Sequence, residues 1–159
     1  MAYHITWTCY GQWLHGDARG YVDRRSNDPD TPYAHGGTSL YNASADRMKE
    51  RAVWLSETQR RMATESLRRT CHFKTWELLA VNVQPDHVHV VIRHGPAYAR
   101  AAMRLLKGWA TRALKTTDPT RTRWWTDGGK VEFVRSAARL AQVVAYVGCQ
   151  PFPQVEPPA

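Results

Sequence analysis

The sequence is poor in cysteine and lacks long apolar runs, and each shortage excludes a class of protein. Three cysteines occur in 159 residues, with no C-x-x-C pair (Cys9, Cys71, Cys149). This odd, scattered set indicates neither a disulfide framework nor a structural zinc knuckle, and a reducing cytoplasm is the default. No apolar stretch is long enough to span a bilayer, and residues 1–4 do not open a signal peptide. We therefore expect a cytoplasmic protein with no membrane partner.

Acidic residues are also scarce relative to basic ones. The 22 Lys and Arg outnumber the 14 Asp and Glu, which gives a formal net charge of +8. This excess favours polyanionic partners such as nucleic acid, although ribosome-binding and membrane-surface proteins share it. Seven Trp and seven Tyr could stack on unpaired bases, but most are expected in the core.

Apolar periodicity and turn signals predict one α+β domain over residues 1–159, with no internal repeat. We expect an antiparallel sheet with helices packed mainly on one face. A stretch rich in Asp, Asn, Pro and Gly predicts a long loop insertion at 22–43. Strands are expected at 3–10, at 75–83 and in the histidine run that ends at 92, and the last two should pair as a hairpin across the turn at 84–86. Helices are expected at 44–52, 56–70 and 97–115. A hairpin of Trp124-Trp125 with 130–134 around 127–129 and a helix from Ser136 to Pro151 complete the expected elements.

Two histidines, His87 and His89, stand two residues apart in an apolar run that reads as a strand. Alternate side chains of a strand share a face, so both imidazoles should point the same way. Burying two imidazoles without a ligand or hydrogen-bond partner is costly. Each histidine alone is better explained as a satisfied structural residue, but the pair favours a metal site. Imidazole ligands by themselves suit zinc or manganese.

A tyrosine and an amide lie four residues apart in the last expected helix, at Tyr146 and Gln150. That spacing places them on one helix face, although Pro151 biases Gln150 away from helical geometry. On the residues alone, a tyrosine on an amphipathic helix is usually part of the core, and a Gln before Pro usually ends a helix.

These motifs together carry a resemblance. The His-Val-His motif followed by Tyr-Val-Gly-Cys-Gln-Pro at 146–151 resembles the HUH endonuclease superfamily, and more narrowly its single-tyrosine transposases of insertion sequences and the REP-associated tyrosine transposases. The segment 8–20 is similar to a Thr-Tyr-Gly-Thr-Trp-Leu-Pro-Gly-Asp-x-Arg-Gly block of one branch. Asp86 stands where relatives have Asn, and His15 where they have Pro.

The resemblance implies a ferredoxin-like core and a metal-dependent single-strand DNA transposase of the prokaryotic cytoplasm or nucleoid. In such enzymes Tyr146 would be the nucleophile, and His87, His89 and Gln150 would bind Mg²⁺ or Mn²⁺. Attack would leave a 5′-phosphotyrosine and a free 3′-hydroxyl, so DNA could be cut and rejoined, at hairpin-bearing ends. The tyrosine would act on its own histidine pair or, in a homodimer, on a partner's.

Basic residues of the helix expected at 97–115 could contact a DNA strand along the length of the helix. An apolar face is predicted at Tyr98, Ala102, Leu105, Trp109 and Ala113, and the broader polar face carries Arg100, Arg104, Lys107, Arg112 and Lys115. An ordinary solvated face explains most of these charges equally well. Trp124 and Trp125 alternate sides on a strand, so one of them is free to stack on a base; we assign that role to Trp124.

Two alternatives stay open at the level of sequence. One is a non-catalytic or domesticated protein that binds hairpin nucleic acid on the same fold. The other is a metal-dependent phosphoesterase in which Tyr146 belongs to the core.

Overall fold

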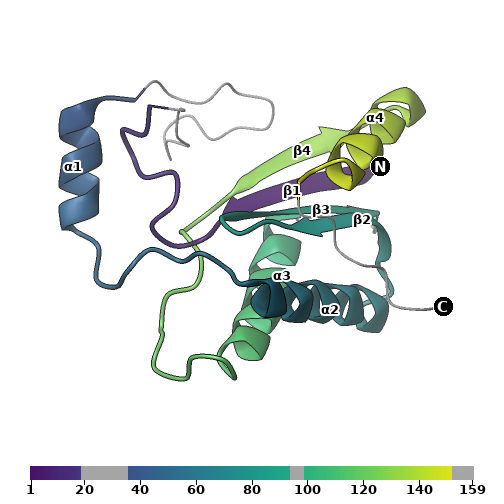
Figure 1. Cartoon of the computed structure of the whole chain (residues 1–159). Helices are drawn as coiled ribbons and strands as arrows, with labels where there is room; N and C mark the ends of the chain where they lie inside the picture. Colours follow the sequence, from purple (N-terminus) through teal and green to yellow (C-terminus); the bar gives the residue numbers. More distant parts are fainter. Residues whose placement is uncertain (19–35, 94–98, 152–159) are drawn as a thin grey trace.

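The computed structural model describes residues 1–18, 36–93 and 99–151. The strands of this part of the chain form one four-stranded sheet, which Figure 1 shows with helices packed beside it. In chain order the elements are β1 (Ala2–Thr8), α1 (Thr38–Asp46), α2 (Glu57–Phe73), β2 (Glu77–Val83), β3 (His87–Arg93), α3 (Ala99–Leu114), β4 (Lys130–Val134) and α4 (Ala137–Gly148). No helix in this part of the chain is sufficiently long and apolar to cross a bilayer.

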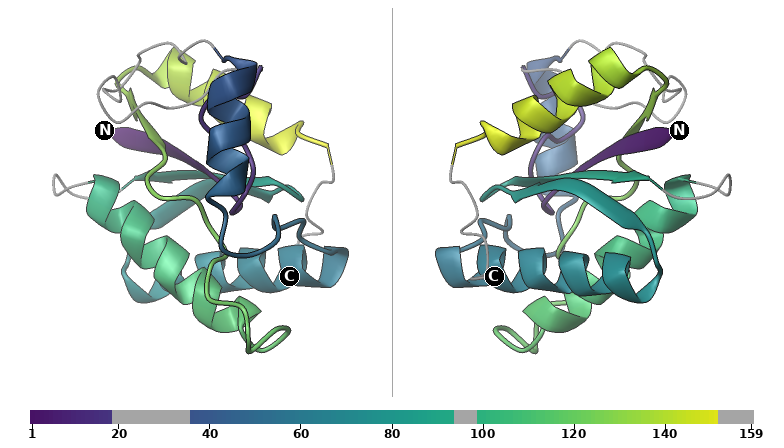
Figure 2. Two further views of the ribbon diagram at one scale, coloured as in Figure 1. Left: turned by 90° about the vertical axis from the view of Figure 1, so that its left-hand side faces the viewer. Right: turned by 90° about the vertical axis from the view of Figure 1, so that its right-hand side faces the viewer.

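The sheet is antiparallel throughout, with the strand order β2-β3-β1-β4. This order, with α2 and α3 as the crossovers, is the ferredoxin-like arrangement. Figure 2 shows α2 and α3 on one face of the sheet and α4 on the other. The expected α+β fold is confirmed, and the helix that carries Tyr146 is the one on the opposite face.

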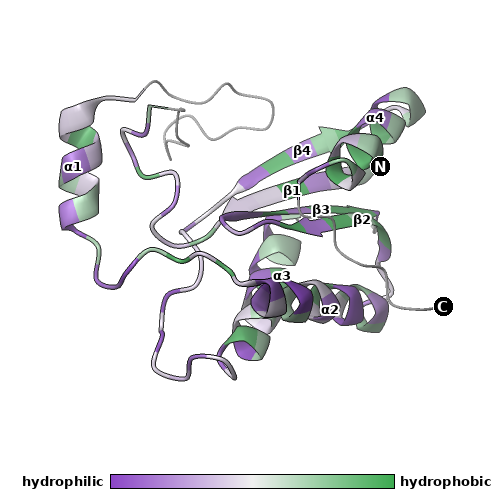
Figure 3. Cartoon of the chain, in the orientation of Figure 1, coloured by the Kyte–Doolittle hydropathy of each residue, from purple (hydrophilic) through white to green (hydrophobic). Residues whose placement is uncertain are grey.

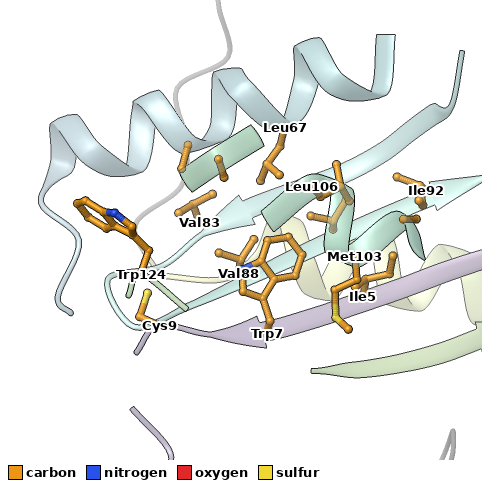
Figure 4. Packing of buried hydrophobic residues seen from close by; sticks show 14 of the residues in the cluster. Ile5, Trp7, Cys9, Leu67, Val83, Val88, Ile92, Met103, Leu106 and Trp124 are labelled. Atoms are coloured by element: carbon orange, nitrogen blue, oxygen red, sulfur yellow. The ribbon is translucent and has the colours of Figure 1, made fainter. Parts of the chain in front are cut away.

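Strand periodicity divides the sheet into two different faces. On β1 the side chains of Ile5 and Trp7 lie in the main core with those of Val88 and Ile92 on β3. Figure 4 shows them packed against Leu106 of α3, among others. The hydropathy colouring of Figure 3 shows the strands mixing apolar and polar residues, as expected of a sheet whose two faces differ. One face of the sheet therefore packs in the main core, and the candidate site lies on the other face.

Leu106 lies at the centre of this core and is fully buried. We expect Leu106→Ala to lower the free energy of unfolding by about 3 kcal/mol, because it removes buried methyl groups and leaves a cavity. Urea denaturation followed by circular dichroism measures the change. Leu40→Ala on α1 is the control, because Leu40 is exposed and should lose less than about 0.5 kcal/mol.

The opposite face of the sheet is apolar only where α4 rests on it. Val143 and Val147 of α4 are buried against Ala2, Val91 and Val134. Beyond that contact the same strand faces carry histidine and threonine, including His4, Thr6 and Thr8 of β1. The apolar part fixes α4, and the polar part remains open beside it.

Two expected elements are wrong. A helix spans 38–46 rather than 44–52, so part of the segment expected as a loop is helical, while 19–35 lie outside the described residues. Residues 49–55 form no helix or strand, because long-range hydrogen bonds hold them: the Val53 amide donates to the Tyr10 carbonyl (2.8 Å) and the Leu55 amide to that of Pro85 (2.8 Å). The expected hairpin at 124–134 is reduced to β4, and Trp125 forms only an isolated bridge with Cys9.

Elsewhere the helix signals are confirmed. Ser56 caps α2 with a capping box to Gln59, and the Ser136 hydroxyl accepts from the Arg139 amide (3.2 Å) at the start of α4. On α3 the predicted apolar face is confirmed at Ala102 and wrong at Trp109, which is exposed with Arg112 over its ring. Leu105 and Ala113 are half-buried, and Tyr98 lies outside the described residues. The buried positions, which include Met103, Leu106, Ala110 and Leu114, are shifted by about one residue from the predicted ones.

Candidate active site

The two histidines of β3 both point to the α4 side of the sheet, while Val88 between them points into the core. Their rings are nearly perpendicular, with centroids 4.8 Å apart. The His87 Nδ1 atom is 2.6 Å from a carboxylate oxygen of Asp86, in the turn that precedes β3. A carboxylate on one ring nitrogen fixes the orientation of the imidazole and directs the other nitrogen outward, as is usual for metal-binding histidines.

His89 is held in a similar way by hydroxyl and imidazole groups of β1. Its Nδ1 atom lies 3.2 Å from the Thr6 hydroxyl and 3.1 Å from His4 Nε2. The pairing of β1 with β3 places Thr6 directly opposite His89. Its other nitrogen, Nε2, is buried and has no hydrogen-bond partner. Because burial, and next the nearby His87 and His4, disfavour a positive charge, the pKa of His89 falls to about 3.

His4, which sequence reasoning missed, also belongs to this cluster. Its ring stacks on that of His89 with centroids 5.3 Å apart, and its Nδ1 atom is 3.6 Å from Glu132 on β4. Glu132 in turn accepts from Arg139 of α4 at 2.6 Å. Burial lowers the pKa of His4, and Glu132 partly offsets this effect. The alternation of His4, Thr6 and Thr8 predicts a shared polar face, but only the strand order shows which histidines it faces.

The tyrosine predicted as the nucleophile lies beside the histidines. Tyr146 projects from α4 with its ring edge-on to His89, at a centroid distance of 5.6 Å. Its ring is 6.4 Å from that of His4. The side chain is 54% exposed, so it is not a core residue. The structure thus brings His87, His89 and Tyr146 together on the wall of one groove of about 930 Å³.

Gln150 is less well placed than the residue spacing suggested. α4 ends at Gly148 with Cys149 as its cap, so Gln150 lies beyond the helix. Its side-chain amide donates to the Tyr146 carbonyl at 3.3 Å. It is therefore one turn from the tyrosine, as predicted, but it does not line the groove with the histidines.

The side chains present suit a divalent ion. His89 offers a buried nitrogen without a partner, and its low pKa keeps the imidazole neutral, as a metal ligand must be. Within 1–18, 36–93 and 99–151, no group of three His, Cys, Asp or Glu side chains is arranged to hold a metal. A metal ion bound by the two imidazole nitrogens would therefore need further ligands with oxygen atoms, such as an amide, water or the substrate.

The predicted DNA-binding residues divide into three groups. Arg100 lines the groove, and Arg104, Arg112 and Lys115 are exposed along α3. Lys107 instead stabilises the turn before β4, because its ammonium group donates to the carbonyls of Thr126 (2.8 Å) and Gly128. Burial lowers the pKa of Lys107 to about 8. The choice of Trp124 is wrong: it is only 3% exposed and packs in the core, so no base can reach its ring.

Comparisons with known proteins agree with this geometry. A family model described as "Transposase IS200 like" matches residues 45–150. Among solved structures, the chain is similar to a REP-associated tyrosine transposase bound to a REP hairpin, with a TM-score of 0.53 and 16% identity. That alignment covers 92% of this chain and 63% of the other, so the chain spans less than two thirds of that relative.

A further similar structure, a proposed transposase from Deinococcus radiodurans R1, has a TM-score of 0.47 and 18% identity over 92% of this chain and 88% of that one. No curated protein matches the sequence. The likeness to the first structure shows a shared fold. Because the family model covers most of the chain, the protein belongs to the family of IS200-like transposases.

Proposed function

We propose that this transposase cuts and rejoins single-stranded DNA through a 5′-phosphotyrosine on Tyr146, with the help of a divalent metal. The observation that carries the proposal is the exposed Tyr146 ring set edge-on against His89, whose Nε2 atom is buried without a partner. A core tyrosine would be buried, and a structural histidine would have both nitrogens satisfied.

The chemistry of the step balances without a nucleotide cofactor. The Tyr146 oxygen bonds to the scissile phosphorus, and the bond from phosphorus to the 3′-oxygen breaks. The phenol loses one proton and the departing 3′-oxygen gains one, so the net reaction consumes none. Because the phosphodiester is exchanged for a phosphotyrosine, a 3′-hydroxyl of another strand can reverse the step and rejoin the DNA.

The ion would be Mg²⁺ or Mn²⁺, held by His87 and His89 with Gln150 as a third ligand, and when bound it would offset negative charge on the scissile phosphate. The protein would hold the histidine side chains in the orientation that binds the ion. Asp86 orients His87, and Thr6 with His4 orients His89. Gln150 would have to turn from its bond to the Tyr146 carbonyl to reach the site.

The DNA substrate is proposed to be a single strand with a hairpin at its end. Support comes from the solved relative, which is bound to a REP hairpin, and from the net charge of +8. The basic side chains Arg100, Arg104 and Arg112 of α3, and Lys115 directly after it, would contact phosphates and position the DNA without reading its sequence.

The decisive experiment is a search for the covalent intermediate. The probes are 3′-labelled single strands that cover the imperfect palindromes in the DNA flanking the gene. With Mn²⁺, the wild-type protein should form a labelled adduct that survives denaturation, because the 3′ fragment stays on the tyrosine. Tyr146→Phe should form none, since it keeps the ring but lacks the oxygen.

Tyr41→Phe on α1 is the matched control, because Tyr41 is also exposed but lies outside the groove; it should form the adduct normally. Binding of every probe with no adduct on any would favour a hairpin-binding protein. Release of inorganic phosphate from small esters, unaffected by Tyr146→Phe, would favour a phosphoesterase.

A further inference from the structure

The groove at the histidine pair continues well beyond the reacting groups. Its far wall is formed by the loop that follows β1 and by the segment that leads to β4, and includes Tyr10, Gly11, Trp13, Leu14, His15 and Arg123. Its volume of about 930 Å³ is near the top of the range of roughly 300–1,000 Å³ that single small ligands occupy. The scissile phosphate alone would leave much of this space empty.

The charges in the groove suit a nucleic-acid strand. Arg100, Arg123 and Lys130 contribute cationic groups, and Asp127 is the one carboxylate among the described residues that line it. Arg123 is exposed, and its guanidinium lies over the Tyr10 ring at 5.8 Å from the centroid. An arginine held against an aromatic ring presents a flat cationic and aromatic surface to the groove.

Trp13 occupies an unusual backbone conformation on this wall. Its φ is 51°, in the left-handed region that residues other than glycine rarely adopt. Such conformations are typically maintained by the surrounding structure and cluster at functional sites. The half-buried indole of Trp13 lines the groove, so the strained residue is also one that a ligand would touch.

The surrounding loop is held firmly enough to maintain that conformation. The buried Gln12 side chain donates to the Val53 carbonyl at 3.1 Å. Gly11 has a φ of 80° and packs so closely that a Cβ there would lie 2.8 Å from Ala52 Cα. These contacts tie the loop to the irregular segment 49–55. The indole is therefore presented by a fixed loop, which lowers the entropy cost of binding a partner.

We propose that Trp13, with Tyr10 and Arg123 beside it, is a stacking site for one unpaired base of the single strand that enters the active site. The proposal rests on the proposed function for the identity of the strand. Trp13 contributes an aromatic face that accepts any base, and Arg123 neutralises a neighbouring phosphate. The site positions the DNA relative to Tyr146, and it takes the role that the buried Trp124 cannot fill.

A double-mutant cycle with the DNA tests this assignment. The parent protein is Tyr146→Phe, which does not cleave, and the probes are the flanking single strands with an abasic site moved one position at a time. Affinity is measured by fluorescence anisotropy. We expect one or two abasic positions to weaken binding about tenfold, and Trp13→Ala to weaken binding of the intact strand to a similar extent. Combining the two changes should cost little more than either alone, because the same stack is lost.

Two control variants separate stacking from general damage. Trp13→Phe keeps an aromatic face and should recover most of the affinity. Trp54→Ala removes an indole that is 65% exposed outside the groove and should leave affinity and the abasic profile unchanged. Thermal melting checks that each variant is folded. The abasic scan of the parent protein requires no Trp13 variant, so the test holds even if Trp13→Ala unfolds.

The outcomes distinguish this proposal from the proposed function. A flat abasic profile, or additive losses in the cycle, would overturn the stacking site even if Tyr146 forms its adduct. Coupling between Trp13 and one abasic position supports the stacking site, and it would do so even if no adduct formed and the transposition chemistry were rejected.

Discussion

Replacing His89 with alanine is expected to lower the rate of DNA cleavage by ~10³-fold or more, while the affinity for hairpin DNA changes less than about twofold. His89 is the buried member of the pair, and its Nε2 atom has no hydrogen-bond partner among the described residues. Loss of a metal ligand removes charge stabilisation worth several kcal/mol at the scissile phosphate. The basic residues that would contact the DNA backbone lie on α3 and are untouched.

The measurement pairs single-turnover cleavage with an equilibrium binding assay on the same labelled strand. Calorimetric titration with Mn²⁺ provides a readout independent of activity, and His89→Ala should show no specific binding. His72→Ala is the matched control, because His72 is exposed on α2 and lies outside the groove. Parallel loss of binding and cleavage would contradict the division of labour between the histidine pair and the basic helix.

The sequence was sufficient for the elements whose signals are local. The capping box at Ser56 and the cap at Ser136 depend on residues three positions apart, and both helices begin where predicted. The shared face of His87 and His89 follows from strand periodicity alone. The approach of Tyr146 to this pair came from the family resemblance, since nothing local in the sequence brings residues so far apart into contact.

The errors occur where tertiary contacts override local pattern. His4 was passed over because its partners, His89 and Glu132, come from two different strands that only the sheet order places on either side of β1. Trp124 was expected at the surface, but without a hairpin its indole turns into the core. The local pattern predicts helix at 47–52, yet Glu50 accepts from the backbone amides of Thr122 and Arg123, and the segment is irregular.

The contacts of α4 indicate whether Tyr146 acts on the histidine pair of its own chain or on that of a partner. Val143 and Val147 are buried in the sheet of the same chain. Asn82, only 2% exposed, donates to the Val147 carbonyl at 3.3 Å, and Gln84 donates to the Pro151 carbonyl. If α4 left this sheet and no other helix took its place, the buried Asn82 amide would lose its acceptor, at a cost of about 1–3 kcal/mol, while Gln84 would keep only its bond to the Asn82 side-chain oxygen. In this chain the Tyr146 ring already lies edge-on to its own His89, at a centroid distance of 5.6 Å. We therefore expect Tyr146 to act on the histidine pair of its own chain.

Mixing two inactive variants checks this expectation. Tyr146→Phe and His89→Ala are co-expressed with different tags, and any complex that carries both tags is isolated. An active site built from two chains would combine the intact tyrosine of one with the intact histidines of the other, and would regain up to about half of wild-type cleavage per site. A site within one chain regains none, because every chain lacks an essential group.

Wild-type protein co-expressed with Tyr146→Phe is the control, and it shows that cleavage is detectable in mixed preparations. Cleavage by the doubly inactive mixture would contradict this expectation. It would mean that α4 leaves its own sheet and that the partner's α4 and the residues after it supply the carbonyls that Asn82 and Gln84 contact.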